Sequence, residues 1–221
     1  MGSGGLRRNV VRLACAALGV VAMAYQFGRL ATLPTFDAGN FFSFFTIQSN
    51  VLAVAALALT AIVRREERGP ALDAARTAAT MYVTITGVVF AVFLKGLQES
   101  LDTHNAFVNG VVHYVIPAVL LIDWLLDPPR HRVGPRVAAA WLCYPLAWFA
   151  YTVLRGRSVG WYPYPFVDVS RHGYGGVLLH ALLFLVGFAA LAAAFAAVGN
   201  GRVSRAVPSP AGTSSSRGGG V

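Results

Sequence analysis

The sequence has few charged residues, since Asp, Glu, Lys and Arg make up 12% of its 221 residues, whereas soluble domains average about 25%. It has two cysteines, Cys15 and Cys143, which form neither a metal-site spacing nor a disulfide framework. Strand-like alternation of apolar and polar residues is also missing, which disfavours a transmembrane β-barrel. What remains is 56% hydrophobic residues, a composition typical of a helical membrane protein.

Six apolar runs have roughly the 17–25 residues that an α-helix needs to cross a bilayer. They lie at 13–30, 41–63, 77–97, 105–126, 136–154 and 174–199. We therefore expect an all-α membrane protein, with six transmembrane helices in one bundle that spans residues 1–199. Residues 200–221 are rich in Gly, Ser and Pro, which predicts a disordered cytoplasmic tail.

The net charge of +9 could suggest a nucleic-acid partner, but the positions of the basic residues favour another explanation. If the N-terminus is cytoplasmic, 13 of the 18 Lys and Arg residues fall in cytoplasmic segments and 5 in outer segments. The positive-inside rule then places both termini in the cytoplasm. We expect no nucleic-acid partner.

Seventeen Arg against one Lys, with abundant Ala, indicate a genome rich in G and C, so we expect a multi-pass protein of a bacterial plasma membrane.

The fourth apolar run carries a histidine, His113, although a polar ring in hydrocarbon is costly and usually faces a bundle interior or a cavity. A rise of ~1.5 Å per residue places His113 ~12 Å below the helix start. Asn105, Asn109 and His113 are spaced i, i+4 and i+8, which predicts one polar stripe along the helix. Pro117 continues this stripe, and we expect it to kink the helix.

The second apolar run begins with the aromatic stretch FFSFFTIQSN. Thr46 lies five residues into it, at an expected depth of ~8 Å. Ser43, Thr46 and Asn50 are spaced by i+3 and i+4, so we expect them on one face of one helix. His180, six residues into the last run, is expected at ~9 Å.

Thr46, His113 and His180 are thus predicted at similar depths in the outer half of the membrane. A lone Thr usually bonds a carbonyl of its own helix, and a lone His often makes an interhelical hydrogen bond. Their coincidence in depth favours a shared cavity. The stiff aromatic segment WYPYPF, residues 161–166, is expected to anchor at the membrane interface and to roof this cavity.

The six-helix plan, with Thr46 in FFSFFTIQSN and His113 followed by Pro in HYVIPAVLLID, resembles the androgen-induced-protein family and its bacterial six-transmembrane branch. Animal members of this family, which include the androgen-dependent regulator of tissue factor pathway inhibitor, hydrolyse fatty acid esters of hydroxy fatty acids with an intramembrane Thr and His. The resemblance implies a membrane lipid-ester substrate, with Thr46 as nucleophile and His113 as general base. A hydroxyl that attacks the ester carbonyl while an imidazole takes its proton is established chemistry.

Further side chains are candidates for substrate binding, by their depth or by their place in the roof. They are Ser43, Asn50, Asn109, Tyr151, Trp161, Tyr164 and His180. We expect no metal and no cofactor. Two alternatives remain: a non-enzymatic carrier, sensor or regulatory subunit, in which Thr and His only join helices, and a b-type haem protein with His113 and His180 as axial ligands. The sequence does not indicate an oligomeric state.

Overall fold

The computed structural model describes residues 3–94 and 105–206, and six of its helical segments are long and apolar enough to cross a membrane, as predicted. The described residues form no strand. The six segments comprise α1 (Ser3–Leu30), α3 (Phe45–Ile62), α4 (Pro70–Val89) with the π-turn η2 (Phe90–Leu94), α5 (Ala106–Gly110) with the π-turn η4 (Val111–Val115) and α6 (Ile116–Leu126), α7 (Pro135–Ala140) with α8 (Cys143–Val159), and α9 (Val169–Ala206). Short elements are α2 (Ala38–Ser43), η1 (Arg65–Glu67) and η5 (Pro165–Val167).

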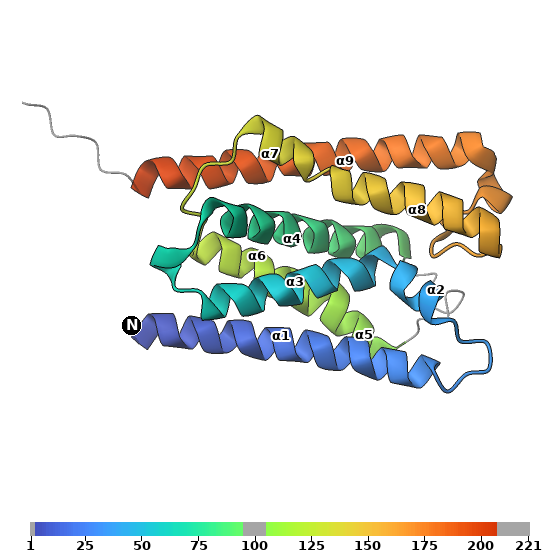
Figure 1. The fold of residues 1–221 in the computed structure, drawn as a ribbon, viewed down its shortest axis with the longest axis horizontal. Coiled ribbons are helices and arrows are strands. Elements are labelled where there is room, and N and C mark those ends of the chain that lie inside the picture. Colours follow the sequence, from blue (N-terminus) through green and yellow to red (C-terminus); the bar gives the residue numbers. More distant parts are fainter. Residues whose placement is uncertain (1–2, 95–104, 207–221) are drawn as a thin grey trace, which may run out of the picture.

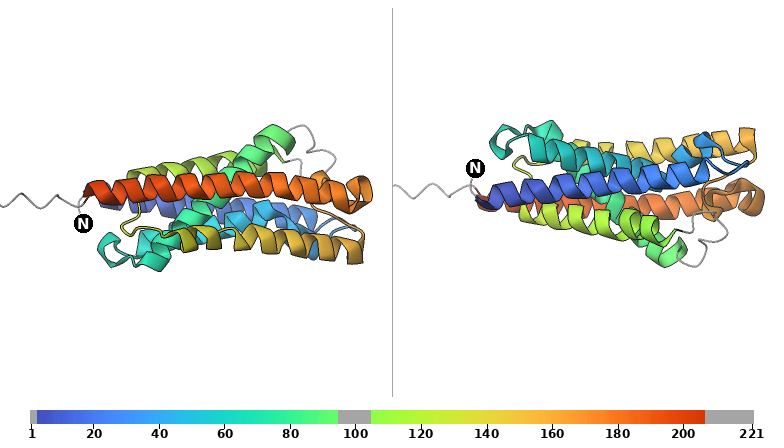
Figure 2. Two further views of the ribbon diagram at one scale, coloured as in Figure 1. Left: turned by 90° about the horizontal axis from the view of Figure 1, so that it is seen from above. Right: turned by 90° about the horizontal axis from the view of Figure 1, so that it is seen from below.

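The helices run along a common axis in one bundle (Figures 1 and 2). Helix α1 packs on α3, α3 on α4, and α4 on α6, whereas α9 contacts α4, α7 and α8. The first and last described residues lie at the same end of the bundle, which we call the terminal end; the opposite end, with α2 and the α8–α9 connection, is the loop end (Figure 1). Which side of a membrane the terminal end faces stays a prediction.

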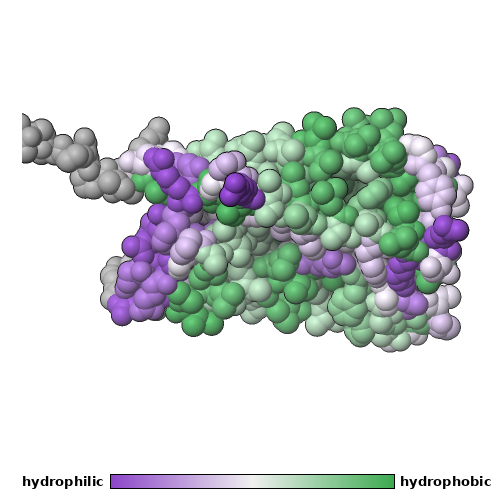
Figure 3. Space-filling model, turned by 45° about the horizontal axis from the view of Figure 1, so that its top comes forward, coloured by the Kyte–Doolittle hydropathy of each residue, from purple (hydrophilic) through white to green (hydrophobic). Residues whose placement is uncertain are grey.

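The helices differ in how much of each is buried. About half of the apolar window is buried in α3 and α4 (56% each) and in Ala106–Leu126 (50%), but only 17% in α7–α8 and in α9. Apolar residues cover the middle of the surface, between more polar ends (Figure 3). This arrangement suits a lipid-facing layer formed by α8 and α9 on one side of the more buried helices α3, α4 and α6 (Figure 1).

The second predicted helix is interrupted, so the expected common face is wrong for Ser43. Phe44 is extended (φ −66°, ψ 125°) and separates α2 from α3. The Asp37 side chain caps the start of α2 by accepting the Asn40 N–H. Ser43 therefore belongs to α2, whereas Thr46 and Asn50 remain one turn apart in α3.

The fourth span contains the kink that Pro117 predicts, in the form of the π-turn η4. Pro117 has no N–H to donate to the carbonyl of His113, four residues earlier. The Ile116 N–H instead bonds the Val111 carbonyl, five residues back. The His113 carbonyl faces Gly87 of α4, where a Cβ atom would lie 2.7 Å from its oxygen. Gly87 thus makes room for the kink.

Helix α9 extends past the predicted end at residue 199, so the boundary of the tail at residue 200 is wrong. The Asn200 side chain accepts the Val133 N–H and donates to the Val133 carbonyl, which holds α9 against the segment before α7. At the other end Gly173 is non-helical (φ 62°, ψ 172°) and separates residues 169–172 from the continuous helix, which begins at Tyr174 as predicted. The rest of the predicted tail, 207–221, and the connection at 95–104 lie outside the described residues.

Candidate active site

Thr46 and His113, which come from different helices, lie side by side. The Thr46 Oγ1 is 3.4 Å from the His113 Nε2 and 3.1 Å from the Tyr164 hydroxyl. Both Thr46 and His113 are 8% exposed. The structure thus brings together two of the three side chains predicted at similar depth. The catalytic roles given to them stay predictions.

Thr46 differs from the other threonines of the described helices that make hydrogen bonds. Those side chains bond the carbonyl four residues earlier, the usual structural role. They are Thr60, Thr77, Thr80, Thr84 and Thr86. For Thr46, the residue four positions earlier is Phe42, which precedes the break at Phe44, and its carbonyl accepts the Gln48 amide instead. The break therefore frees the Thr46 hydroxyl to face His113 and Tyr164.

Phe90 of η2 fixes the plane of the His113 ring by stacking on it, with ring centroids 3.7 Å apart and planes 10° from parallel. The Nε2 of this ring faces the Thr46 Oγ1. In the tautomer that carries its proton on Nδ1, the Nε2 can accept the Thr46 hydroxyl.

Asn50 holds the two halves of the site together. It is fully buried, and its Nδ2 donates to the Thr46 carbonyl (2.8 Å) and to the Val112 carbonyl (3.1 Å). Because Val112 precedes His113, this amide couples the first turn of α3 to η4. Ser49 also donates to the Thr46 carbonyl and bonds Thr86 of α4. Asn50 is thus placed to position Thr46 and His113 rather than to bind substrate.

Tyr164 reaches the site from the segment between α8 and α9. Its hydroxyl accepts the Thr46 N–H at 3.2 Å and bonds the Thr46 Oγ1. This contact takes the place of an N-cap, because Phe44 offers α3 no capping side chain. Burial raises the pKa of Tyr164 despite the opposing effect of its bonds with Thr46, so at neutral pH the phenol keeps its proton and can donate it.

Two apolar pockets meet at this point. One lies among α3, α4, α8, α9 and the 164–167 segment, and the other lies among α1, α3, η2 and the α5–η4 region. Thr46, Leu94 and Tyr164 line both pockets. His113 and Asn109 line the second. The Thr46 hydroxyl therefore lies at the junction of two largely hydrophobic chambers.

Four of the predicted binding residues lie elsewhere. Ser43 and Tyr151 bond each other at 2.9 Å, between α2 and α8. Trp161 packs edge-on against Phe44, and His180 packs against the His172 ring. Among the described residues that line the two pockets, none of these four appears. The predicted roof is formed by Tyr164 and Phe166, which line the first pocket, and not by Trp161.

The polar stripe predicted along the fourth span is also shorter than expected. The Asn105 side chain accepts the Val108 N–H and so caps α5. Asn109 and His113 remain on the pocket side.

Sequence reasoning missed Phe90, which stacks on His113, and Gln26, a 6% exposed amide of α1 that lines the second pocket. A glutamine inside an apolar run was a usable signal. Phe90 gave none, because an aromatic residue in a membrane helix is ordinary.

The histidine pair of the haem hypothesis is not arranged as two axial ligands of one haem. The His113 Nε2 faces Thr46 and its ring is covered by Phe90, while His180 contacts His172.

Comparisons with known proteins add no assignment: no protein-family model, curated protein or solved structure matches the chain.

Proposed function

We propose that this chain is an integral membrane hydrolase of lipid esters, with Thr46 as nucleophile and His113 as general base. The observation that carries the proposal is the Thr46 hydroxyl itself: it turns away from its own helix and faces the His113 Nε2 at 3.4 Å. A hydroxyl within reach of an oriented imidazole is the arrangement that nucleophilic catalysis needs. The family resemblance of the two motifs points to the same pair.

In the proposed reaction the Thr46 Oγ1 attacks the ester carbonyl carbon while its proton moves to the His113 Nε2. The imidazolium then gives that proton to the departing alkoxide, leaving the acyl group on Thr46. Water, deprotonated by the same imidazole, attacks the acyl-threonine, and His113 returns the proton to Thr46. The carboxylic acid and the alcohol are the products.

The oxyanion formed in each step would meet donors already close to Thr46. Thr46 is the second residue of α3, where the N–H groups of the first turn have no partner within the helix. These N–H groups and the positive end of the helix dipole favour a negative charge. The Tyr164 hydroxyl, 3.1 Å from the Thr46 Oγ1, is the other nearby donor. Preorganised donors of this kind are among the largest contributions to catalysis.

The two pockets suggest the shape of the substrate. An ester whose carbonyl lies at Thr46 would place its acyl chain in one pocket and its alkyl chain in the other. Fatty acid esters of hydroxy fatty acids have this form, with two long apolar arms on one ester. The proposed setting is the outer half of a bacterial plasma membrane, with the terminal end in the cytoplasm as the positive-inside rule predicts.

The test is hydrolysis of such an ester by purified protein in detergent or nanodiscs. Thr46→Ala is expected to abolish turnover and labelling by a fluorophosphonate probe, whereas Thr46→Ser, which keeps a hydroxyl in place, retains measurable activity. His113→Ala should be about as damaging as Thr46→Ala, and the double variant little worse, because residues that act as one unit are non-additive.

The matched control is Thr84→Ala, since Thr84 bonds the Thr80 carbonyl in the usual structural way. It should leave turnover and labelling within about twofold of wild type, because it removes an ordinary backbone contact. Activity that persists in Thr46→Ala, or a probe label on another residue, would end the assignment of Thr46 as nucleophile.

A further inference from the structure

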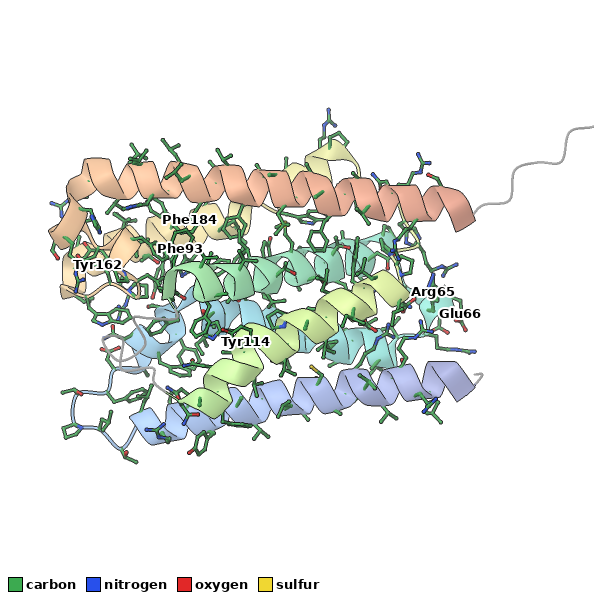
Figure 4. All side chains as sticks on the ribbon, turned by 180° about the vertical axis from the view of Figure 1, so that it is seen from behind. Arg65, Glu66, Phe93, Tyr114, Tyr162 and Phe184 are labelled. Atoms are coloured by element: carbon green, nitrogen blue, oxygen red, sulfur yellow. The ribbon has the colours of Figure 1, made fainter. Side chains whose placement is uncertain are left out.

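At the terminal end of the bundle, far from Thr46, five arginines surround two aspartates. We call this group the Arg–Asp cluster, and it consists of Arg8, Arg12, Arg65, Arg68, Arg76, Asp123 and Asp127. Figure 4 shows its member Arg65, with Glu66, at the end opposite to Tyr162. Thr46 and Ile62 lie near the two ends of α3, so the cluster is roughly 24 Å from the proposed active site at ~1.5 Å per residue.

The cluster joins α1, the η1–α4 segment and the end of α6. Arg12 donates to Asp123 at 2.8 Å and to Asp127 at 2.6 Å, and Arg76 donates to Asp123 at 2.7 Å. Arg68 donates to Asp127 at 2.6 Å, and Arg65 also bonds this carboxylate. Both oxygens of each carboxylate thereby accept hydrogen bonds from arginines, four of which take part.

The positive charge in this region exceeds the negative charge that faces it. A pocket opens beside the cluster, and five arginines line it against two carboxylates. The lining charges are Arg8, Arg12, Arg64, Arg65, Arg68, Glu66 and Asp127. Arg64 is neutralised by Glu66 at 3.0 Å. The other four lining arginines, Arg8, Arg12, Arg65 and Arg68, all pair with Asp127. Arg12 also pairs with Asp123, and Asp123 is shared with Arg76.

Arg68 is the member of this lining with unused donors. Its side chain is 1% exposed, and one of its nitrogens, Nη2, bonds Asp127. Its Nε and Nη1 are buried and have no hydrogen-bond partner among the described residues. Buried charged N–H groups without acceptors are costly. An anion in the pocket would supply the acceptors that Arg68 lacks.

We propose that this pocket binds a phosphate group, through Arg68 with Arg8 and Arg65 at its rim. Guanidinium groups present paired N–H donors whose geometry matches the oxygens of a phosphate. The rim also holds Ile62, which is 71% exposed. That apolar neighbour would suit the chain of an anionic phospholipid whose headgroup phosphate enters the pocket, while a free phosphate would use the same donors. This site is independent of the proposed hydrolase activity.

The first measurement is the binding of inorganic phosphate to the purified protein in a neutral detergent, by calorimetry and by the rise of the unfolding temperature. The second is native mass spectrometry of the protein in mixed micelles that contain either phosphatidylglycerol or phosphatidylcholine. We expect saturable binding of phosphate, or retention of phosphatidylglycerol in preference to phosphatidylcholine. Binding of phosphate points to a free anion as the ligand, and retention of the lipid without phosphate binding points to a headgroup.

Three variants test the assignment. Arg68→Lys keeps the charge beside Asp127 but removes the forked donors, and it should weaken binding at least tenfold. Arg8→Gln, a change in a side chain that is 39% exposed, should weaken binding several-fold with an unchanged unfolding temperature in the absence of anion. The matched control is Arg136→Gln, which removes the same charge from an exposed position that does not line the pocket, and it should bind as wild type does.

The site is supported if Arg68→Lys and Arg8→Gln bind phosphate or phosphatidylglycerol more weakly than the wild type does, while Arg136→Gln binds as the wild type does. Because Arg8→Gln leaves the buried bonds of Arg12, Arg68 and Arg76 in place, its result does not depend on refolding of the cluster. The proposal is overturned if neither phosphate nor phosphatidylglycerol binds the wild type, or if all three variants reduce binding equally.

Discussion

The two ends of α3 use polar groups in opposite ways. Near its start, Thr46, His113 and Tyr164 are neutral, are joined by hydrogen bonds of 3.1–3.4 Å, and border two pockets. Beyond its end, the Arg–Asp cluster is ionic and its bonds from Arg12, Arg68 and Arg76 to the aspartate side chains are 2.6–2.8 Å long. Short charge-assisted bonds hold helices in place, whereas longer neutral bonds beside empty space can be exchanged for bonds to a substrate.

This difference suggests a division of labour along the bundle. The cluster ties α1, α4 and α6 together at one end, so the opposite end can tolerate pockets and a helix break. A buried charge network is costly to form but also costly to break by removing one partner. Changes in the cluster should therefore affect folding, and changes around Thr46 should affect activity with less effect on folding.

The largest effect is expected for Asp127→Asn. Asp127 is 1% exposed and accepts from Arg12, Arg65 and Arg68, and removing its charge leaves buried arginines without a counterion. The free energy of unfolding should fall by about 3–5 kcal/mol, seen as a lower unfolding temperature in detergent. Asp37→Asn is the control, because the pair of Asp37 with Arg155 is exposed at 3.4 Å and should cost less than about 1 kcal/mol. Equal stability of the two variants would refute the division of labour.

The next effect concerns Tyr164→Phe, which removes the hydroxyl next to Thr46 but keeps the ring. If this hydroxyl stabilises the oxyanion, kcat should fall about 100-fold, the usual cost of losing one such donor. Tyr144→Phe is the matched control: the Tyr144 ring packs against Phe45, the neighbour of Thr46 in the chain, and its hydroxyl donates to Gln48 and not to Thr46. It should stay within about threefold of wild type. A Tyr164→Phe variant with full activity would remove Tyr164 from the mechanism.

A smaller effect is expected for Gly87→Ala, which adds a methyl group beside the backbone of His113. The added Cβ would lie 2.7 Å from the His113 carbonyl oxygen, so η4 must shift. Overpacking of this kind costs about 1–3 kcal/mol, and the shift should lower activity by moving the His113 ring from Thr46. Gly110→Ala, where a Cβ meets nothing within 4 Å, should be neutral or more stable by up to about 1 kcal/mol. Wild-type kinetics in Gly87→Ala would argue against the strict placement of His113.

The number of helices followed from the sequence because apolar runs of bilayer length are a strong signal. Depth placed Thr46, His113 and His180 at similar levels, and the family resemblance singled out Thr46 and His113 as a pair. Depth does not say which way a side chain points, and this explains the misplaced residues. Ser43 was separated from Thr46 by the break at Phe44, and His180 lies at a similar predicted depth but contacts His172.

The position of Tyr164 could not be predicted from spacing. A proline-rich loop has no periodicity, and the bond of its hydroxyl to the first turn of α3 depends on how α8 and α9 pack against the interior. The Arg–Asp cluster was partly predictable, since Asp123 and Asp127 end a helix that faces the arginine-rich loops. The sequence alone gave no reason to choose Arg68 over its neighbours, because burial of one arginine is decided by the tertiary packing.

The smallest expected effect is the loss, at low pH, of the stability that Asp127 contributes. Burial alone would raise the pKa of Asp127, but the hydrogen bonds from Arg12 and Arg68 outweigh it and hold this pKa well below its usual range. A carboxylate with a depressed folded-state pKa contributes stability above its unfolded value of about 3.9, and loses it as the pH falls toward the folded-state value. The stability difference between wild type and Asp127→Asn should therefore be constant from pH 7 to pH 5 and shrink by about 0.7 kcal/mol at pH 3.5. Thermal unfolding of both proteins across this range measures it, and the other carboxylates cancel because both proteins carry them. A stability difference that stays constant down to pH 3.5 would mean that Asp127 has the same pKa in the folded and unfolded chains. The ion pairs of the cluster would then not stabilise the fold, and the proposed contrast with the site at Thr46 would fail.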